Sequence, residues 1–532
     1  MPISILQTLS KPLEKHINLN ITNYLNKNNL LYLNQSGFRS NSSCHTALVN
    51  ITENVYDALN NNMLTGLLFF DFRKVFDMVN HYLLLQKLQL YNFSENLLSL
   101  LKSYLNNGNQ CISIGQNKSS FQNIISGVPQ GSILGPLLFK LFINDLPFSL
   151  SVNSDLFADD TNVYTSTPDI TSLNNKLQLE TNKIIQCCQN NAMIINESKT
   201  KSMLIATNYQ LKNPLNKLDI QINNNQIENV SEFKLLGVII DRNFSWNKHT
   251  EYICKTLNKK LYQLKKIKSR LPSNLLKLFY FGHLQSHLDY CSTIWDTCSK
   301  TSLNYLQRVQ KLAFKLINDK PLTKNSTVCT YETLAKSLNI LTIQNRFTFN
   351  KYILLFKLVH KKCPNYLTNI LVFKNTPYTD INRRFNIPEP NKSIYKNSLK
   401  YIGHCLWNNL PTSIKNTTVL SDFKANMSKE LFVNGSMNCK VTHVLYVIKC
   451  SGCAELYIGC TTKLQNRVTV HRQHIREPNL RKMPLIEHLH ICGKGEFKIY
   501  PFFKMPYSDP MKMRLKEQYF IDKLNPKLNI SK

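Results

Sequence analysis

The sequence predicts an α+β fold divided among several domains. At 532 residues the chain is longer than one ordinary hydrophobic core, and this length suggests roughly three or four domains. Hydrophobic residues make up 43% of the chain and include 27 Phe and 24 Tyr, which is ample material for buried cores. From about residue 60, short apolar runs typical of strands alternate with stretches whose apolar residues recur at helical spacing. These observations exclude a single small module and a largely disordered chain.

The charge balance points to a polyanionic partner. The chain has 65 Lys and Arg against 33 Asp and Glu, which gives a formal net charge of +32 at pH 7. Such an excess binds the phosphates of nucleic acids by releasing their counterions. A coding sequence rich in A and T, which favours Lys and Asn codons, is the alternative source of part of this excess.

The sequence also limits the compartment. The 15 Cys are odd in number and show no disulfide-like spacing, which favours a reducing environment. No apolar run approaches the about 20 residues of a membrane span, and the N-terminus lacks the pattern of a secretory signal. We therefore expect a protein of the nucleus or cytoplasm that has no membrane partner.

Two apolar strands are expected to bring acidic side chains to one point. Residues 67–70 form a buried strand that ends at Asp71, and strand-forming residues flank a tight turn at Asp159 and Asp160. Hard cations such as Mg²⁺ prefer carboxylate oxygens, and two of them about 4 Å apart can activate a 3′-hydroxyl and stabilise a leaving pyrophosphate. Acids at strand ends are otherwise N-caps or solvated turn residues.

Helices are expected around and after these strands. Residues 81–104 and 133–146 have apolar residues at helical spacing, and a glycine-rich turn at 127–131 separates them. Residues 169–191 predict one amphipathic helix. The basic stretch 255–270 would place lysines around a helix, either as a face for backbone phosphates or as an ordinary solvated surface.

The chain is expected to end in a separate small α/β unit. Residues 233–240 predict a short strand pair, and strand-like runs return after residue 437 at 444–448 and 455–458. The region between them is mostly helical and shows no repeat. The expected domains are residues 1–242, 243–330, 331–437 and 438–532.

Six sequence blocks occur in order within residues 1–242. They read QSGFR from residue 35, FDFRKVFDMVNH from residue 70, SGVPQGSILGPLLF from residue 126, FADDT from residue 157, NESKTK from residue 196 and LLGV from residue 235. Together they resemble the reverse transcriptase of jockey-like non-LTR retrotransposons. The resemblance implies a right-hand polymerase palm with partial fingers and a helical thumb.

The same resemblance implies a metal site made of Asp71, Asp159 and Asp160 that binds Mg²⁺ or Mn²⁺. Because adjacent strand residues point to opposite faces, Asp159 and Asp160 are not expected to coordinate equally. Asp71 and Asp159 are therefore the expected main ligands.

The implied nucleotide-binding residues lie in the same blocks. Phe76 would lie under the incoming sugar, Gln130 would position nucleotide and template, and Lys199 would protonate or sense the leaving phosphate. Phe76 as a core aromatic and Lys199 as a surface cation are the alternatives. The full implied set is Arg39, Phe72, Phe76, Gln130, Gly131 and Lys199.

The sequence departs from the family at its start and beside the first acid. The first residues, MPISIL, resemble a block that an arginine and a longer fingers region normally precede. The resemblance therefore implies a chain without part of the fingers and without an upstream endonuclease, in which Arg39 partly compensates. Arg73 and Val75 stand where the family usually has a small polar residue and Ala.

A second set of catalytic residues lies near the C-terminus. Tyr446 and Tyr457 lie in the two strand-like runs, Arg467 and His471 are four residues apart on one helix face, and Glu517 opens a last apolar helix. These residues resemble a GIY-YIG nuclease domain like that of Penelope-like retroelements. The resemblance implies that Tyr446 activates water, Tyr457 and Arg467 hold the phosphate, and Glu517 binds a metal ion. His471 and His474 as solvated helix residues are the alternative.

Two cysteines raise the question of zinc. Cys450 and Cys453 have zinc-clip spacing, with Cys439 and Cys460 nearby. A CxxC pair in a turn without a clear second pair is more often not a metal site. The first tyrosine motif also reads Val-Leu-Tyr instead of Gly-Ile-Tyr.

These patterns favour an RNA-directed DNA polymerase of a retrotransposon, with a C-terminal domain that nicks DNA. Its expected partners are an RNA template, a DNA primer or target, and deoxynucleoside triphosphates. The alternatives are an impaired polymerase that acts as a GIY-YIG endonuclease, and a relic that only binds nucleic acid. The helical region around Trp295 and Trp407 also resembles these elements, and helical packing is its expected role.

Overall fold

The computed structural model divides the chain into two compact units. The first comprises Met1–Leu334 and Thr342–Lys424, and the second comprises Ala335–Leu341 and Ala425–Lys532. The structure describes residues 4, 6–106, 108–318, 331–371, 385–434, 442–450, 453, 455–463, 466–467, 470–471, 485, 488, 492, 497–504 and 510–524. Among these residues, no helix combines the length and the apolar character that a bilayer crossing needs.

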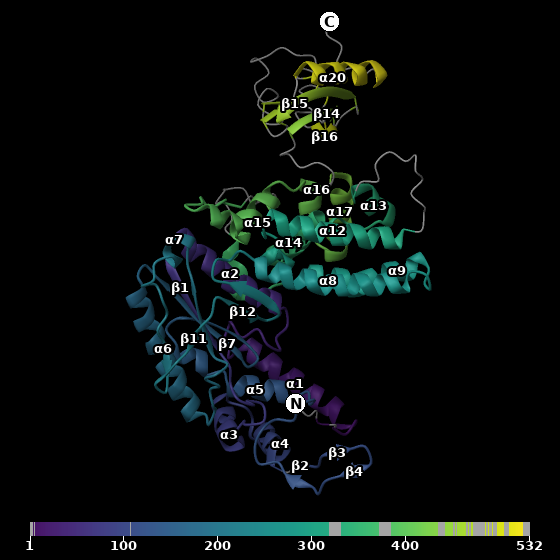
Figure 1. The fold of residues 1–532 in the computed structure, drawn as a ribbon. Coiled ribbons are helices and arrows are strands. Elements are labelled where there is room, and N and C mark those ends of the chain that lie inside the picture. Colours follow the sequence, from purple (N-terminus) through teal and green to yellow (C-terminus); the bar gives the residue numbers. More distant parts are fainter. Residues whose placement is uncertain are drawn as a thin grey trace. The chain divides into compact units, whose positions relative to one another are not determined.

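The first unit contains a five-stranded sheet in the order β11-β8-β1-β7-β6. Its strands β1, β7 and β11 are labelled in Figure 1. The central strand β1 pairs antiparallel with both neighbours, and all of its residues are buried. Its last pair, Phe70 opposite Thr161, places the end of β1 beside the start of β7. The strands are β1 (Leu64–Phe70), β6 (Asn153–Phe157), β7 (Asp160–Thr167), β8 (Lys201–Ile205) and β11 (Glu228–Asn229).

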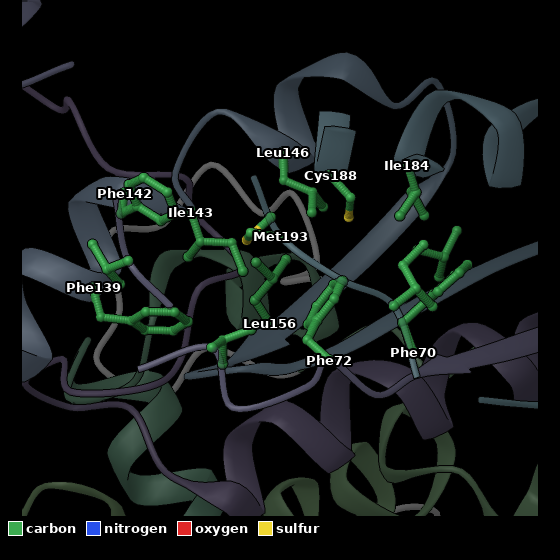
Figure 2. Close-up of a cluster of buried hydrophobic side chains, with 14 of the residues drawn as sticks. Phe70, Phe72, Phe139, Phe142, Ile143, Leu146, Leu156, Ile184, Cys188 and Met193 are labelled. Atoms are coloured by element: carbon green, nitrogen blue, oxygen red, sulfur yellow. The ribbon is translucent and has the colours of Figure 1, made fainter. Parts of the chain in front are cut away.

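Successive side chains of the central strand β1 point to opposite faces of the sheet, and both faces are buried. One face of β1 packs with α5 and α6 in a hydrophobic core that contains Phe70, Phe139 and Ile184 (Figure 2). On the other face, Phe69 stacks on Phe233 with ring centroids 4.0 Å apart. The helices of this part are α1 (Ser10–Lys27), α2 (Cys44–Asn60), α3 (His81–Leu90), α4 (Glu95–Asn106), α5 (Gly135–Phe142), the 3-10 helix η1 (Leu146–Ser149), α6 (Ile170–Asn190) and α7 (Asn208–Leu211).

Two predicted helices differ from those observed. The stretch 81–104 is not one helix but two, α3 and α4, because Asn92 between them adopts a left-handed conformation with φ of 55°. The stretch 133–146 contains a shorter helix, α5, followed by η1. The predicted strand pair at 233–240 is confirmed as β12 and β13. The short hairpins are β2 (Asn109–Gln110) with β5 (Gln122–Asn123), β3 (Ser113–Ile114) with β4 (Asn117–Lys118), β9 (Gln221–Ile222) with β10 (Asn225–Gln226), and β12 (Glu232–Leu235) with β13 (Val238–Asp241).

The rest of the first unit is helical. The apolar side of α8 is buried through Ile253, Leu257 and Leu264, while most of its lysines are exposed. Trp295 and Trp407 are buried, as predicted. The helices are α8 (Asn247–Ile267), α9 (Ser273–Tyr280), the π-helical turn η2 (Phe281–Gln285), α10 (Ser286–Asp289), α11 (Ser292–Trp295), α12 (Lys300–Ile317), α14 (Ile343–Val359), the 3-10 helices η3 (Asn365–Ile370) and η4 (Ser393–Asn397), α15 (Leu399–Asn408) and α16 (Thr412–Lys415). Two further helices, α13 (Tyr331–Leu338) and α17 (Leu420–Asn434), begin in the first unit and end in the second.

The second unit contains a three-stranded antiparallel sheet in the order β15-β14-β16 (Figure 1). Its strands are β14 (Thr442–Cys450), β15 (Leu456–Lys463) and β16 (Phe497–Lys504), and the helix α20 (Pro510–Leu524) packs against β15. Leu445 and Met513 are the centre of the small core between strand and helix. The predicted strand run at 444–448 is confirmed within β14, and the run at 455–458 is confirmed in β15 except for its first residue.

Candidate active sites

Three carboxylates meet where β1 ends and the β6–β7 hairpin turns. Asp71 follows β1 directly, and Asp160 is the first residue of β7. The next residues after the Phe70–Thr161 pair are Asp71 and Asp160, which therefore lie opposite each other. Side chains of opposed residues in an antiparallel pair point to the same face of the sheet, so these two carboxylates do as well. Ala158 and Asp159 form the two-residue turn between β6 and β7, and Ala158 has a left-handed φ of 58°. The strand alternation by which we ranked Asp159 above Asp160 does not apply, because Asp159 is not in a strand.

The carboxylates of this cluster lie close enough for their charges to interact. Burial raises the pKa of Asp159, and the charge of Asp71 raises it further. Burial raises the pKa of Asp160 to about 6, with further contributions from the charges of Asp159 and Asp71. No ion pair joins any of the three to a lysine or arginine in the described part of the chain. A group of mutually repelling carboxylates without a cationic side chain fits a divalent metal ion.

Asp71 is held by a loop about 125 residues further along the chain. The side-chain amide of Asn196 donates to Asp71 Oδ2 at 2.8 Å, and its backbone N–H donates to the Asp71 carbonyl at 2.7 Å. The Asp71 N–H in turn donates to Thr200 Oγ1 at 3.3 Å. The sequence analysis predicted a role for Lys199 in this loop and none for Asn196 or Thr200. The signal was there, since both residues lie in one of the matching blocks.

A second segment, residues 34–37, holds the acidic turn in place, and we call this segment the brace. The side-chain Oε1 of Gln35 accepts from the N–H of Gly37 at 2.9 Å and from the N–H of Ala158 at 3.2 Å. The N–H of Ser36 donates to the Leu156 carbonyl at 2.7 Å. Gln35 and Ser36 are buried although they are polar. The conformation of the turn that carries Asp159 is therefore fixed by a segment about 120 residues earlier in the sequence.

Gly37 is expected to be essential for the position of this turn. A Cβ atom on Gly37 would lie 2.3 Å from the Ala158 N and 2.9 Å from its Cα, and these are backbone atoms that cannot rotate away. Gly37→Ala should displace the turn by up to about 1 Å to relieve this contact, and such a misplacement should lower primer extension by up to about a hundredfold. The control is Gly282→Ala, because a Cβ there meets nothing within 4 Å. Equal extension rates for the two variants would contradict the claim that the segment of Gly37 positions the turn of Asp159.

The glycine turn that follows β5 is tied to the segment after Asp71. Gly127, with φ of 86°, donates its N–H to the Val79 carbonyl, and a Cβ there would lie 2.7 Å from the Asp77 carbonyl oxygen. The Gln130 side chain donates to Asp77 Oδ1 at 2.9 Å. Gly131 is left-handed with φ of 116°. The turn is therefore fixed to residues 76–79 of the segment that follows Asp71.

The other candidate nucleotide-binding residues differ in how exposed they are to solvent. Phe72 is only 6% exposed and lies in the core (Figure 2), where it is not available as a side chain to contact a nucleotide. Phe76 is half-buried and packs on Phe139 with ring centroids 4.2 Å apart. Arg39 donates to the Tyr32 carbonyl at 2.7 Å. Lys199 is exposed.

The C-terminal unit brings its predicted catalytic residues together. Tyr446 is buried, and its hydroxyl lies 3.0 Å from His471 Nε2 and accepts from Arg467 Nε at 3.2 Å. His471 is buried too, so the solvated alternative is wrong for it, while His474 lies outside the described residues. Burial raises the pKa of Tyr446 and of Tyr457, which keeps both phenols neutral at physiological pH.

Glu517 faces the same site from α20. Its Oε1 accepts from the Cys460 N–H at 2.8 Å, and its Oε2 accepts from the Cys460 thiol at 2.9 Å. The negative charge of Glu517 contributes to the raised pKa of Tyr457, which places the two side chains near each other. Gly459 allows the Tyr446 ring to cross β15, since a Cβ there would lie 2.6 Å from the tyrosine hydroxyl oxygen.

A cysteine and histidine cluster lies beyond β14. Single ligand atoms from Cys450, Cys453, His488 and Cys492 all lie within 4.8 Å of one another. The Cys453 Sγ is 3.2 Å from His488 Nε2. Three sulfurs and one imidazole at this spacing fit tetrahedral zinc. The sequence prediction included Cys450 and Cys453 but missed the second pair, whose signal was the spacing His488-x3-Cys492.

The remaining two candidate cysteines do not extend this cluster. Cys460 is bonded to Glu517, and Cys439 lies outside the described residues.

Residues 1–240 match the family model described as reverse transcriptase (RNA-dependent DNA polymerase). These residues are a reverse transcriptase domain. The probable RNA-directed DNA polymerase from transposon BS of Drosophila melanogaster is 25% identical over 360 residues, which cover 65% of this chain and 38% of that protein. The RNA-directed DNA polymerase from mobile element jockey of the same species is 26% identical over 333 residues, which cover 60% and 36%. The chain thus spans less than two fifths of the length of these relatives.

Residues 442–529 match the family model of the GIY-YIG catalytic domain. The resemblances to a jockey-like reverse transcriptase and to a GIY-YIG domain are therefore confirmed, as is the α+β fold of the reverse transcriptase domain. The likeness of the C-terminal domain to that of Penelope-like elements stays a prediction. Among solved structures, apo telomerase from Candida tropicalis aligns with a TM-score of 0.33 at 12% identity over 68% of this chain and 58% of that chain. Telomerase from Candida albicans, solved with the TWJ fragment of telomeric RNA, aligns with a TM-score of 0.30 at 13% identity over 63% and 54%.

Proposed function

We propose that the chain is an RNA-directed DNA polymerase of a retrotransposon, which transfers nucleotides onto a DNA 3′-end with two divalent metal ions. The observation that carries the proposal is the meeting of Asp71, Asp159 and Asp160 at one strand edge of a reverse transcriptase domain. The raised pKa values of Asp159 and Asp160, and the absence of an ion pair to any of the three acids among the described residues, support a role as ligands of Mg²⁺ or Mn²⁺.

In this proposal the chain contributes positioning and charge. Asn196 and Thr200 hold Asp71, and Gln35 holds the turn of Asp159, so that both carboxylates are oriented before substrates bind. Metal ions bound there would lower the pKa of the primer 3′-hydroxyl and stabilise the charge of the leaving pyrophosphate. The glycine turn around Gln130 and Gly131 would contact nucleotide and template, and the exposed lysines of α8 would bind backbone phosphates.

The proposal is tested by primer extension with the purified full chain. A labelled DNA primer on an RNA template, supplied with all four deoxynucleoside triphosphates, should be extended with Mg²⁺ or Mn²⁺ and not in EDTA. Omission of the RNA template should abolish the product. Tight binding of the RNA–DNA hybrid without extension in either metal would contradict the polymerase and favour a protein that only binds nucleic acid.

We also propose that the C-terminal unit nicks DNA and so supplies the 3′-hydroxyl that the polymerase extends. The cluster of Tyr446, Arg467 and His471 supports this proposal. Because burial keeps Tyr446 protonated, its phenol can accept a proton from water only as it passes its own proton to His471. Arg467 would stabilise the phenolic oxygen during this transfer, and Glu517 would hold a metal ion at the phosphate.

Zinc is the metal we propose for Cys450, Cys453, His488 and Cys492. A zinc ion at this site would link Cys450 at the end of β14 to His488 and Cys492, and so stabilise the C-terminal unit. Metal analysis of the full chain should find about one zinc ion per chain, and Cys492→Ser should lose it. Cys111→Ser is the control, because Cys111 lies in the first unit and should leave the zinc content unchanged. Zinc retained at the full ratio in Cys492→Ser would contradict the site.

A further inference from the structure

Helix α2 connects the helical region after residue 342 to the acidic turn. On one side, Asn50 donates to both carboxylate oxygens of Asp155, at 2.9 and 3.1 Å, and so holds β6. On the other side, the buried carboxylate of Glu53 accepts from the N–H groups of Leu399 at 2.6 Å and Lys400 at 3.0 Å, which are the first residues of α15. The helical region is thereby anchored to the helix that supports the hairpin of Asp159.

One tyrosine of the helical region, Tyr366, contacts the segment that holds the acidic turn in place. The Tyr366 hydroxyl, from η3, lies 2.7 Å from Ser36 Oγ and donates to Thr46 Oγ1 at 3.2 Å. Ser36 is 2% exposed, and its N–H bonds to Leu156 in β6. Its neighbours Gln35 and Gly37 contact the backbone of Ala158, the residue before Asp159. A continuous path of hydrogen bonds and backbone contacts therefore runs from Tyr366 to the acidic turn.

We propose that Tyr366 is a positioning residue of the polymerase site, through which the helical region after residue 342 fixes the turn of Asp159 and Asp160. The expected effect of Tyr366 on catalysis rests on the proposed polymerase function. Its expected effect on the position of the turn does not. The loss of the Tyr366 hydroxyl releases the side chain of buried Ser36, and the segment 34–37 then holds Ala158 less firmly. The expected result is a slower chemical step with unchanged substrate binding, because Tyr366 contacts the brace and not the acids.

The chain provides a matched control for this test. Tyr395, in η4, is another tyrosine of the helical region; it is buried whereas Tyr366 is half-buried, and its hydroxyl interacts with Asp57 of α2 and with Ser398. Tyr395→Phe loses one hydroxyl contact to α2 but leaves Ser36 untouched. Tyr366→Phe and Tyr395→Phe therefore remove the same atom and differ in whether the brace is affected.

Two measurements on the full-length protein decide the proposal. Hydrogen–deuterium exchange should become faster at residues 34–37 and 156–160 in Tyr366→Phe and not in Tyr395→Phe. The kcat of primer extension should fall about fivefold in Tyr366→Phe, with KM for the nucleotide within about twofold of the parent. Ser36→Ala should have the same effect, and the double variant should be no slower than either single one.

The outcomes separate this inference from the polymerase proposal. If exchange at these two segments is unchanged in Tyr366→Phe, or changes equally in Tyr395→Phe, Tyr366 is not a positioning residue, whatever the activity. If exchange changes as expected but the parent chain extends no primer, the positioning role stands and the polymerase function fails. If the parent is active and Tyr366→Phe alters only KM, the catalytic consequence is wrong.

Discussion

Asp71→Asn and Asp159→Asn are each expected to abolish primer extension. Each change keeps the size of the side chain but removes a negative charge from the group that would bind the metal ions. A loss of about a thousandfold in rate is expected, because several kcal/mol of charge stabilisation depend on these ligands. Binding of the RNA–DNA hybrid, measured by fluorescence anisotropy, should remain within about threefold of the parent, since no phosphate contact is removed.

The control for these variants is Asp219→Asn. Asp219 is an exposed acid outside the cluster, and its Oδ1 accepts a hydrogen bond from Gln226. This variant should extend primers at the parental rate. Extension that survives in Asp159→Asn would show that the turn acid is not a main ligand and would shift the metal site toward Asp71 and Asp160.

Glu517→Ala and Tyr446→Phe are expected to abolish nicking of plasmid DNA. The first removes the carboxylate that would hold the metal ion, and the second removes the hydroxyl that lies 3.0 Å from His471. Each loss should exceed about a hundredfold, the range for removal of a proton acceptor or a catalytic metal ligand. The measurement is conversion of supercoiled to open-circular plasmid by the full chain with Mg²⁺ or Mn²⁺.

Asp522→Ala is the matched control for the nuclease. Asp522 lies on α20 as Glu517 does, and it is exposed and bonded to Gln518 of the same helix. It should nick at the parental rate. If Glu517→Ala nicks as fast as Asp522→Ala, the C-terminal unit does not use this carboxylate, and a role in binding nucleic acid becomes the better explanation.

Local sequence patterns predicted where the acids lie but not how they are held. The apolar run before Asp71 and the strand formers around Asp159 were sufficient to place both acids at strand ends. The braces from Gln35, Asn196 and Thr200 come from segments about 125 residues away, and no local periodicity reports such contacts. The strand alternation applied to Asp159 failed because it assumed a strand where the chain makes a left-handed turn at Ala158.

Residues that act through tertiary contacts were the hardest to find. Tyr366 and Ser36 are 330 positions apart and carry no shared motif, so only the folded chain brings them together. The Cys450–Cys453 pair was visible, yet its partners His488 and Cys492 are separated from it by a long intervening segment. The single left-handed residue Asn92 divided a predicted helix into two, an event that apolar spacing does not reveal.

The metal site of the reverse transcriptase domain can be located directly by iron-promoted cleavage of the backbone. Fe²⁺ that occupies a Mg²⁺ site generates hydroxyl radicals in the presence of ascorbate and peroxide, and these cut the nearest peptide segments. Our account predicts cuts next to Asp71 and within residues 157–161, suppressed by excess Mg²⁺ and lost together in Asp71→Asn. Cuts at neither segment, or cuts that persist unchanged in Asp71→Asn, would contradict the claim that these three carboxylates form one metal site.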